Sequence, residues 1–482
     1  MLGQSLSIPN LLSGVRIIDV IKRKKSNKYK ASEVSSLVIY DSRRPLSTYD
    51  ITSRSIRVVV CQEFPSRLHP QITYIKVDSL FEAKGIISAN LHGWPSRKLS
   101  LIAVTGTNGK TTVVNLLYEL FTKLGYKAGV ISTLGVKVSG ASCPRKEGRP
   151  NINKLLARMV SEGCQYCFLE CHSYGLAYKG QAAGLHIKGA AILNVTHDHL
   201  DVHGSFEDYF KVKKSLFDRL SSDAFALFNA DDKSGKNLIK DTIAQSFSFG
   251  IHNTADFTVK VTSDSLKGLK LLLEESNLQC RLVGAFNAYN MLAAYAISKL
   301  LGVSSDKIIP QLPALAPVEG RIQTVPTLRE YHCFVDFAHN PDGLENILNA
   351  LNTAKETANK LICVIGCGGN KDKTKRPIMA NIAVKNSTIV IFTSDNPRDE
   401  DPSLIIDDMK RGITESDKKQ TLSIVDRKEA IKAACMLASK GDFVLVVGKG
   451  HEKYQEYRGE KRDFDDVEVL EKVANSSIAS EN

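Results

Sequence analysis

The sequence predicts an α/β protein of three domains, and three observations support this prediction. A length of 482 residues suggests about three domains. From about residue 99 onward, apolar runs of strand length alternate with helical patterns, which is typical of parallel sheets covered by helices. Linker-like segments at Trp94–Arg97 and Pro313–Arg321 interrupt the chain. We therefore expect a small N-terminal α/β domain (residues 1–97), a central P-loop-type domain with a mainly parallel sheet flanked by helices (98–316), and a Rossmann-like C-terminal α/β domain (317–482).

The N-terminal domain is expected to hold short strands at residues 36–40, 56–61 and 73–77. Its first 32 residues contain a single acid against seven bases, a bias that resembles an organelle transit peptide. Apolar residues in the same stretch fit a short docking helix equally, and we favour the helix. They are Leu11, Leu12, Val15, Ile18 and Ile21.

The central domain opens with the stretch that organises the rest of the chain, Leu101–Thr112. An apolar strand ending at Val104 runs into a glycine-rich turn, and a helical pattern follows over residues 113–124. Backbone N–H groups at such a turn and at a helix N-terminus bind phosphate. Lys110 can reach the β- and γ-phosphates of a nucleotide, and the Thr111 hydroxyl can hold Mg²⁺. The loop is shorter than usual, because Val104 occupies the position of the first glycine.

Polar side chains follow two other predicted strands of the central domain. Glu170 follows the apolar run 166–169, and a segment rich in His and Asp, 196–204, follows the run 190–194. Ligands of open α/β sheets bind at the carboxyl ends of the strands, so these side chains are expected beside the nucleotide. Carboxylate oxygens with one imidazole suit Mg²⁺ or Mn²⁺. We therefore predict a divalent metal site that includes Glu170 and His199.

Composition and charge exclude several classes of function. The chain is 43% apolar and 24% charged, with a formal net charge of +12, and has no apolar run near the roughly 18 residues of a membrane helix. Lys and Arg are scattered rather than striped beside aromatic residues, so we expect no nucleic-acid partner. Ten cysteines without framework spacing fit a reducing compartment, and the cluster Cys164–Cys171 is interpreted as buried strand packing. We expect a cytoplasmic monomer that binds no membrane.

Several motifs together resemble those of the Mur ligase superfamily, which also includes the folylpolyglutamate synthases. Thr105–Thr112 is similar to its nucleotide loop. The tract Asp198–Gly204, followed by Tyr209-x-x-x-Lys213-x-x-Leu-Phe, is similar to the segment that carries a carbamylated lysine. Further matches in the last domain are Val335–Glu345, Gly366–Pro377, Ser394–Arg398 and Gly448–Glu452. The resemblance covers nearly all of residues 99–473.

This resemblance implies a set of functional residues. ATP is expected to contact Gly106, Thr107, Asn108, Gly109, Lys110, Thr111, Thr112, Asn290, Arg321, Asp336 and His339. Mg²⁺ is expected at Thr111, Glu170, His199 and Lys213: Thr111 and Glu170 are implied to hold one ion, and His199 with carbamylated Lys213 a second. The catalytic residues implied are Lys110, Glu170, His199 and Lys213. Lys213 is expected to bind CO₂ as a carbamate. A neutral lysine amine that adds CO₂ becomes a carboxylate on a long stem, which can reach a metal that Asp or Glu could not.

Within the family, Asp395–Arg398 resembles the MurE-type subgroup, which adds meso-diaminopimelate. Diaminopimelate differs from lysine by a distal carboxylate, which Arg398 can bind in a bidentate manner. Asp395 or Glu452 can meet the distal ammonium, and Arg376 is a second candidate for a substrate carboxylate. The substrate residues implied are Ser42, Arg376, Asp395, Asn396, Pro397, Arg398, Gly448 and Glu452.

The resemblance implies an ATP-dependent amide ligase of peptidoglycan precursor synthesis. ATP would convert the D-Glu carboxylate of UDP-MurNAc-L-Ala-D-Glu into an acyl phosphate, and the amine of meso-diaminopimelate would displace the phosphate. The sugar-nucleotide end departs from the family pattern at Gly148, Arg149, His172, Tyr178 and Gly180; His172, for instance, replaces a serine. Two alternatives stay open here: a ligase with a different acceptor, and a non-catalytic homologue.

Overall fold

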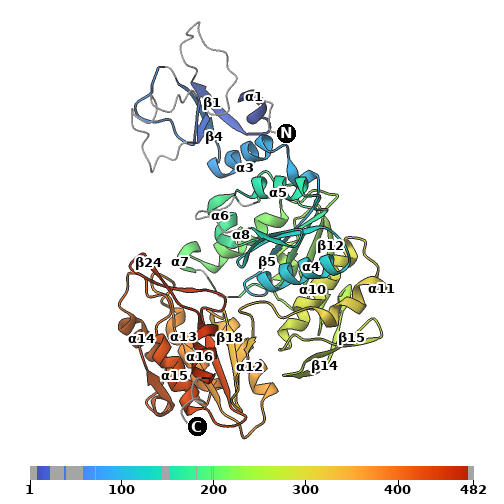
Figure 1. Ribbon diagram of the computed structural model, residues 1–482. Coiled ribbons are helices and arrows are strands. Elements are labelled where there is room, and N and C mark those ends of the chain that lie inside the picture. The colour runs from blue at the N-terminus through green and yellow to red at the C-terminus, as the bar shows by residue number, and fades with distance from the viewer. Residues whose placement is uncertain are drawn as a thin grey trace.

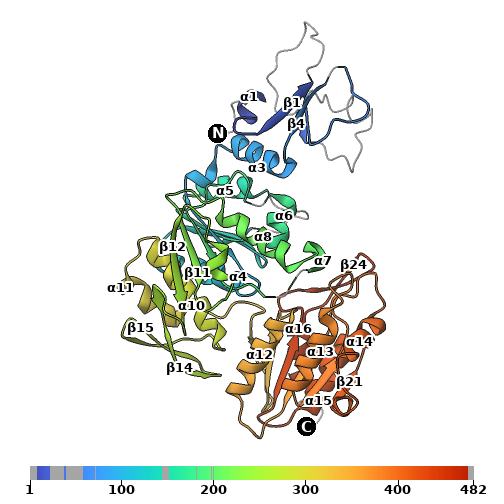
Figure 2. The same ribbon diagram turned by 180° about the vertical axis from the view of Figure 1, so that it is seen from behind.

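The computed structural model describes residues 8–21, 37–39, 58–70, 72–143, 151–180, 182–196, 198 and 200–475. Figures 1 and 2 show three parts that follow one another along the molecule. The N-terminal part lies at one end, the central part in the middle and the C-terminal part at the other end. No helix among the described residues is long and apolar enough to cross a membrane.

The N-terminal part contains a small sheet with the strand order β1-β4-β3-β2. β1 runs antiparallel to β4, whereas β2, β3 and β4 are parallel. The helix α3 packs its buried residues Ala83 and Ile87 in one cluster with Val60 and Ile75 of the sheet. The elements are α1 (Ile8–Leu11), β1 (Ile17–Ile21), β2 (Leu37–Ile39), β3 (Val58–Cys61), β4 (Thr73–Val77) and α3 (Leu80–Leu91).

The predicted docking helix at the N-terminus is wrong beyond its first turn. The helix α1 ends at Leu11, and Ile17–Ile21 form β1, paired with β4. Four of the five residues of β1 are β-branched, and such side chains favour the extended backbone. The apolar positions alone could not separate the two structures, because a short apolar run fits either one.

The central part is built on a sheet with the order β13-β12-β11-β10-β5-β9-β6-β7-β8. The strands from β13 to β6 are mutually parallel, and β7 and β8 add an antiparallel edge. The strands are β5 (Ser100–Thr105), β6 (Ala128–Ser132), β7 (Gly135–Val138), β8 (Ala141–Cys143), β9 (Tyr166–Glu170), β10 (Gly189–Ile192), β11 (Phe225–Asn229), β12 (Gln245–Gly250) and β13 (Phe257–Thr258).

Both faces of this sheet are covered by helices, as alternate residues of β5 show. Ile102 and Val104 pack in one cluster with α4 and α10, whereas Leu101 and Ala103 pack in another with α5 and α8. A parallel sheet buried on both faces has such continuous apolar strands. The cysteines of the Cys164–Cys171 cluster are buried in the second cluster, as predicted. The helices are α4 (Lys110–Lys123), α5 (Ile152–Ser161), α6 (Ser173–Lys179), α7 (Leu200–His203), α8 (Phe206–Phe217), α9 (Gly235–Leu238), α10 (Phe286–Leu300) and α11 (Ser305–Ile308).

The C-terminal part has a second α/β sheet with the order β17-β18-β22-β19-β20-β21, preceded in the chain by the antiparallel sheet β14-β15-β16. Helices α12, α13 and α14 cover one face of the C-terminal sheet, and α15 and α16 cover the other. The antiparallel sheet packs with α4 and α10 of the central part, and its strands are β14 (Lys260–Ser265), β15 (Gly268–Leu273) and β16 (Ser276–Gln279). The strands of the C-terminal sheet are β17 (Gln323–Val325), β18 (His332–Asp336), β19 (Leu361–Ile365), β20 (Ile389–Phe392), β21 (Thr421–Ser423) and β22 (Phe443–Val447), and a separate hairpin holds β23 (Tyr454–Tyr457) and β24 (Glu460–Asp463). The helices of this part are α12 (Pro341–Ala354), α13 (Lys375–Asn386), α14 (Pro402–Lys410), α15 (Arg427–Leu437) and α16 (Asp466–Asn475), with the 3₁₀ helix η4 (Asp417–Gln420). Two further 3₁₀ helices lie earlier in the chain: η2 (Pro95–Arg97) precedes β5, and η3 (Ile309–Ala314) follows α11.

Candidate functional site

The loop between β5 and α4 is shaped by two glycines. Gly106 has a φ of 154° and Gly109 a φ of 87°, and positive φ favours glycine. A Cβ at Gly109 would lie 2.4 Å from Asn290 Oδ1 on α10, so the position leaves no room for a side chain. The helix α4 begins at Lys110, directly after the turn, which directs its unpaired N–H groups at the loop. This backbone is suited to bind an anion.

A side chain after the neighbouring strand holds this loop. Asn194 follows β10, and its Oδ1 accepts hydrogen bonds from the N–H groups of Thr107 at 3.0 Å and Asn108 at 2.8 Å. The Thr107 hydroxyl in turn accepts from the N–H of Thr196 at 2.9 Å and lies 3.0 Å from the Tyr209 hydroxyl. Asn194 is not among the predicted site residues. Its position at the end of the apolar run 190–194 was the signal that could have found it.

Two lysines share one backbone carbonyl in the loop. Lys110 Nζ donates to Gly106 O at 3.0 Å and to Thr107 O at 2.7 Å, and Lys213 Nζ donates to Gly106 O at 2.8 Å. Lys213 projects from α8, is 1% exposed, and has its Nζ 4.5 Å from the ring centroid of Tyr209. Burial and the charge of Lys110 hold the pKa of Lys213 well below its ordinary value. Burial also lowers the pKa of Lys110. An anionic ligand would therefore favour the protonated, charged form of both lysines.

Glu170 ends β9 and faces the first turn of α4. Its Oε1 accepts from the Thr111 hydroxyl at 2.8 Å, and its Oε2 accepts from the N–H and hydroxyl of Thr133 at 2.7 and 2.9 Å. His172 Nε2 lies 3.3 Å from Glu170 Oε1. Burial disfavours the carboxylate, but His172, Lys110 and the two threonine donors together hold the pKa of Glu170 below its ordinary value. Glu170 is therefore an anion at neutral pH.

Part of the predicted metal set lies around this loop. Thr111, Glu170 and Lys213 all contact the loop or its helix, whereas His199 lies outside the described residues. Within the described ranges, no group of three or more His, Cys, Asp or Glu side chains is arranged to hold a metal ion. Mg²⁺ in a phosphate site usually takes one or two protein oxygens and completes its shell with phosphate and water. The Thr111 hydroxyl and the Glu170 carboxylate fit this requirement.

The C-terminal part supplies the facing wall. Arg321 Nη2 donates to Thr111 Oγ1 at 3.2 Å, and its guanidinium lies 4.6 Å from the ring centroid of Phe337. Asp336 accepts two backbone N–H bonds, each of 2.7 Å, and burial raises its pKa. His339 Nδ1 lies 3.0 Å from Phe337 O. Burial lowers the pKa of His339 to about 4, so its imidazole is neutral at pH 7.

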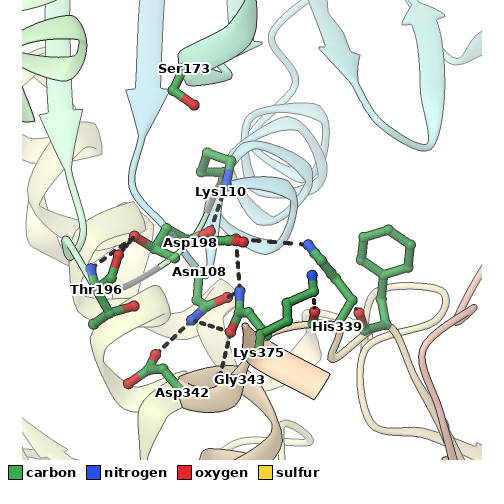
Figure 3. A network of polar contacts seen from close by, with 12 residues as sticks. Asn108, Lys110, Ser173, Thr196, Asp198, His339, Asp342, Gly343 and Lys375 are labelled. Carbon is green, nitrogen blue, oxygen red and sulfur yellow. Dashed lines mark hydrogen bonds and ion pairs between the residues drawn. The ribbon is translucent and has the colours of Figure 1, made fainter. Parts of the chain in front are cut away.

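A polar network connects the loop to the N-terminus of α12 (Figure 3). Asn108 Nδ2 donates to Asp342 Oδ2 at 2.6 Å, and Asn340 Nδ2 donates to Asn108 Oδ1 at 3.1 Å. The same Asn340 amide donates to Asp198 Oδ2 at 3.0 Å, and His339 Nε2 lies 3.9 Å from this oxygen. The predicted nucleotide residues Asn108 and His339, about 230 positions apart in the chain, are thereby brought into one site.

A cavity of about 480 Å³ lies between the loop and the C-terminal part. This volume is typical of small-molecule sites. Its lining includes Lys110, Thr111, Glu170 and Arg321, which suit phosphate and metal. The lining also offers rings, amides and an aliphatic side chain that suit a base and a sugar: Phe286, Tyr289, Asn290, Asn346 and Ile347.

A second group of predicted residues gathers at the carboxyl ends of β20 and β22. A Cβ at Gly448 would lie 2.5 Å from Asp395 Oδ2, so the absence of a side chain leaves room for this carboxylate. Asn396 Nδ2 donates to Glu452 Oε2 at 2.8 Å, and Asn396 Oδ1 accepts from Lys449 Nζ at 3.0 Å. The predicted residues Asp395, Asn396, Gly448 and Glu452 thus share one small region.

Arg398 lies at the edge of this region. Its backbone is left-handed, with φ of 51°, and its side chain is 25% exposed. Its Nη1 donates to Gly369 O at 2.8 Å, and its Nε lies 3.4 Å from Glu456 Oε2. Pro397 packs against the same loop, because a Cβ at Gly369 would lie 1.9 Å from Pro397 O. The turn and the glycine loop therefore hold each other in place.

Arg376, the second candidate for a substrate carboxylate, is fully buried. Its Nη1 and Nη2 donate to the two oxygens of Glu400 at 3.0 and 2.9 Å, and Nη1 also donates to Asp408 at 2.8 Å. Nη2 further donates to Gly368 O at 3.2 Å. Glu400 and Asp408 thus hold Arg376 in place, and Arg376 in turn holds the glycine-rich loop at Gly368. Sequence reasoning did not pair these two carboxylates with Arg376.

Arg427 is a further residue that sequence reasoning missed. It begins α15, and its Nε and Nη2 donate to Asp466 at 2.7 and 2.8 Å in a pair that is fully buried. Nη2 also donates to Val447 O at 2.9 Å, at the end of β22. The Arg427–Asp466 pair therefore supports the strand end from which Gly448 follows. Nothing in the local sequence marks two residues 39 positions apart as partners.

The predicted sugar-nucleotide contacts are described only in part. Ser42, Gly148 and Arg149 lie outside the described residues, as does the side chain of Tyr178. Gly180 is described, with φ of 53°, and a Cβ there would lie 2.7 Å from Phe81 O of α3. The glycine at this position is thus explained by close contact between the N-terminal and central parts.

The fold and the site together define a class of protein: an α/β protein in which a second α/β domain faces a phosphate-binding loop across a nucleotide-sized cavity. The family model of the Mur ligase middle domain matches residues 104–298, and that of the Mur ligase glutamate ligase domain matches residues 320–450. The chain belongs to the Mur ligase family.

Several known proteins are similar to this chain over most of its length. UDP-N-acetylmuramoyl-L-alanyl-D-glutamate–2,6-diaminopimelate ligase from Cytophaga hutchinsonii is 44% identical over 431 residues, which are 89% of this chain and 88% of the relative. The ligase of the same name from Bacteroides fragilis is 43% identical over 423 residues, or 87% of each chain. A solved structure of a ligase of that name has a TM-score of 0.61 at 28% identity and covers 93% of this chain and 96% of its own. A folylpolyglutamate synthase from Mycobacterium tuberculosis, at 17% identity and a TM-score of 0.62, covers 76% of this chain and 92% of its own, and shares the fold.

Proposed function

We propose that the protein is an ATP-dependent ligase that joins meso-diaminopimelate to the D-Glu residue of UDP-MurNAc-L-Ala-D-Glu, with release of ADP and phosphate. The observation that carries the proposal is the cavity between two domains, with Lys110 and Glu170 on one wall and Asp336 and His339 on the other. It occurs in a chain that is 44% identical to a ligase named for this reaction. The intact turn Asp395–Arg398 supports the choice of amino acid.

The chemistry follows from the charges on the two walls. In the first step, a carboxylate oxygen of D-Glu attacks the γ-phosphorus of ATP, the bond to the β-γ bridging oxygen breaks, and ADP leaves an acyl phosphate. Lys110 and Arg321 stand beside the loop, where they would balance the charge on the phosphates. Mg²⁺ held by Thr111 and Glu170 would neutralise phosphate charge when bound. In the second step, the amine of diaminopimelate attacks the acyl carbon, phosphate leaves, and the amine loses a proton.

Lys213 is proposed to carry the carbamate. Addition of CO₂ to a lysine needs the neutral amine, which loses one proton as the N–C bond forms. The depressed pKa of Lys213 increases the fraction of that neutral form. The anionic product would lie beside Lys110, since both side chains contact Gly106 O. With His199, the carbamate is proposed to hold a second metal ion.

Selection of diaminopimelate is assigned to the C-terminal site. Arg398 is partly exposed and could turn its guanidinium from Gly369 O to a distal carboxylate, which it would bind in a bidentate manner. Asp395 and Glu452 would meet the distal ammonium. Arg376, already bound to two carboxylates, would contribute by holding the loop against which the substrate lies. L-Lysine lacks the distal carboxylate and would bind more weakly.

The test is phosphate release by the full chain with ATP, UDP-MurNAc-L-Ala-D-Glu and either meso-diaminopimelate or L-lysine. We expect release that depends on both the acceptor and diaminopimelate, with a ligated product detected by mass spectrometry. Release with L-lysine alone would contradict the assignment of Arg398. A folded protein that binds ATP and releases phosphate with neither amino acid would contradict the proposed reaction.

A further inference from the structure

His172 occupies a distinctive place beside the predicted metal residues. It follows β9 two positions after Glu170, in extended conformation at φ −89° and ψ 143°, and precedes the first turn of α6. Its side chain is 46% exposed and lines the 480 Å³ cavity. The motif resemblance places a serine here, so this imidazole is an addition to the pattern of the family. We propose that His172 is a direct ligand of the metal ion that binds at Thr111 and Glu170.

The distances among three donor atoms support this assignment. Mg²⁺ or Mn²⁺ binds its ligands at about 2.1 Å in octahedral geometry, which places neighbouring ligand atoms about 3.0 Å apart. Thr111 Oγ1 lies 2.8 Å from Glu170 Oε1, and Glu170 Oε1 lies 3.3 Å from His172 Nε2. The two separations lie on either side of the octahedral value. Both neighbouring pairs, Thr111 with Glu170 and Glu170 with His172, are therefore spaced as two ligands of one ion would be.

The surroundings of the imidazole fit a ligand better than a packing residue. His172 Nε2 approaches two oxygens, Glu170 Oε1 and Thr133 Oγ1, each at 3.3 Å. Thr133 also fixes the second oxygen of Glu170 through its N–H and hydroxyl. A partner that orients a ligating carboxylate in this way is typical of metal sites. Thr133 would thus hold Glu170 through Oε2, whereas the ion would replace the contact between Thr133 Oγ1 and His172 Nε2, because this nitrogen has a single lone pair.

One charged neighbour must move when the ion binds. Arg321 Nη2 donates to the same Thr111 hydroxyl at 3.2 Å, on an oxygen that would become a metal ligand. Phosphate oxygens entering the cavity would offer this guanidinium a new partner. The inference therefore concerns the nucleotide-bound protein. It deepens the proposed function, because it rests on a metal ion that accompanies the nucleotide, but it does not depend on which amino acid is ligated.

An imidazole ligand changes which metal the site prefers. Nitrogen ligands raise the affinity for Mn²⁺ and the later divalent metals relative to Mg²⁺, which prefers oxygen. We therefore expect His172→Ser, which introduces the residue of the family pattern, to weaken Mn²⁺ binding in the presence of ADP by roughly tenfold. Binding of Mg²⁺ should weaken less, so the dissociation constant for Mg²⁺ divided by that for Mn²⁺ should fall.

The direct test is pulsed electron paramagnetic resonance on the full chain with ADP and one equivalent of Mn²⁺. A bound imidazole gives ¹⁴N modulation of the Mn²⁺ signal, and uniform ¹⁵N-histidine labelling changes its frequency. We expect this modulation in the wild type and in His186→Ser, a matched control whose partly exposed imidazole pairs with Asp223. We expect it to disappear in His172→Ser. Because His199 is a second predicted metal residue, His199→Ser is measured as well and should retain the modulation.

The outcomes separate this inference from the proposed reaction. Modulation that persists in His172→Ser, or that disappears in His199→Ser alone, would overturn the assignment of His172. Unchanged Mn²⁺ affinity in a folded His172→Ser protein would do the same. Loss of modulation in His172→Ser, in a protein that does not ligate diaminopimelate, would support the assignment while contradicting the proposed reaction. Circular dichroism melts of each variant confirm that the fold is retained.

Discussion

The proposed nucleotide site and the proposed amino-acid site balance their charges in different ways. Beside the phosphate loop, the side-chain nitrogens of Lys110 and Lys213 donate to backbone carbonyls, and burial lowers the pKa of both. In the C-terminal part, Arg376 and Arg427 are bound by carboxylates in bidentate pairs. At the first site Lys110 donates to uncharged backbone oxygens, whereas at the second each arginine is neutralised by carboxylates of the protein.

This difference in charge balance predicts how each site responds to its ligand. A nucleotide would bring further negative charge beside Lys110, so ligand binding there should stabilise the protein. The amino-acid site needs no ligand to hold its shape, so it can discriminate by the fit of one more charged group. Removal of a cation should therefore impair function in the first site and stability in the second.

The largest change in unfolding free energy is expected at the fully buried ion pair of Arg427 and Asp466. Arg427→Met leaves Asp466 buried without its partner, and such a change costs about 3–5 kcal/mol of unfolding free energy. Urea denaturation of the full chain, followed by circular dichroism, measures it. The double variant Arg427→Met with Asp466→Leu should recover much of the loss, because no uncompensated charge remains. A single variant as stable as the wild type would show that the pair does not support the C-terminal fold.

Lys110→Met is expected to separate function from stability in the nucleotide site. Loss of one charged donor to the phosphates should lower kcat by roughly 10²–10³-fold. The melting temperature without nucleotide should be unchanged or higher, since a desolvated cation is removed. Phosphate release and thermal melts measure the two quantities, and Lys123→Met, on the exposed end of the same helix, is the control. A strong loss of stability in Lys110→Met would contradict the expectation that cations of the nucleotide site serve binding and not folding.

Local patterns in the sequence predicted the parts of the nucleotide site that depend on short-range order. The strand-turn-helix around Lys110 and Thr111 and the strand-end position of Glu170 follow from apolar runs and glycine spacing. Asn194 was missed because an amide that caps a loop from another strand is recognised only once the strand order is known. Ile17–Ile21 were misassigned because β-branched residues in a short apolar run fit either secondary structure.

The amino-acid site was harder to predict in its contacts than in its residues. Asp395–Arg398 stand out as a turn, and the resemblance gave them a role. The partners of Arg376, however, come from α14 and the segment before it, and Asp466 reaches Arg427 from the last helix. Such pairings depend on how helices cover the sheet, and residue spacing carries no information about them. Arg376 was therefore foreseen as a substrate residue, while its two internal carboxylates were not.

Arg398→Gln tests whether the amino-acid site selects by a single charge-assisted contact. Such a contact contributes about 1.5–3 kcal/mol, so kcat/KM for meso-diaminopimelate should fall by roughly 10- to 150-fold while that for L-lysine changes little. The matched control is Arg462→Gln, an exposed arginine paired with Glu460 on the nearby hairpin. Equal losses for both amino acids would mean that Arg398 orders the turn instead of reading the distal carboxylate.

The smallest effect is expected in the pH dependence of the unfolding free energy, through Glu400 in its pair with Arg376. The hydrogen bonds from Arg376 lower the pKa of Glu400 to about 2, so the unfolded chain binds this proton more readily than the folded one. The contribution of Glu400 is present above its ordinary pKa and is lost as the pH falls from about 4.5 towards 2. With allowance for its partial exposure, we expect a loss of about 1–2 kcal/mol at pH 3. Unfolding free energies of the wild type and Glu400→Gln, measured from pH 7 to pH 3, should converge by this amount. Glu415→Gln, at an exposed pair with Lys418, should stay parallel to the wild type. If the Glu400→Gln curve also stayed parallel, the bidentate pair would not be the source of the acid sensitivity.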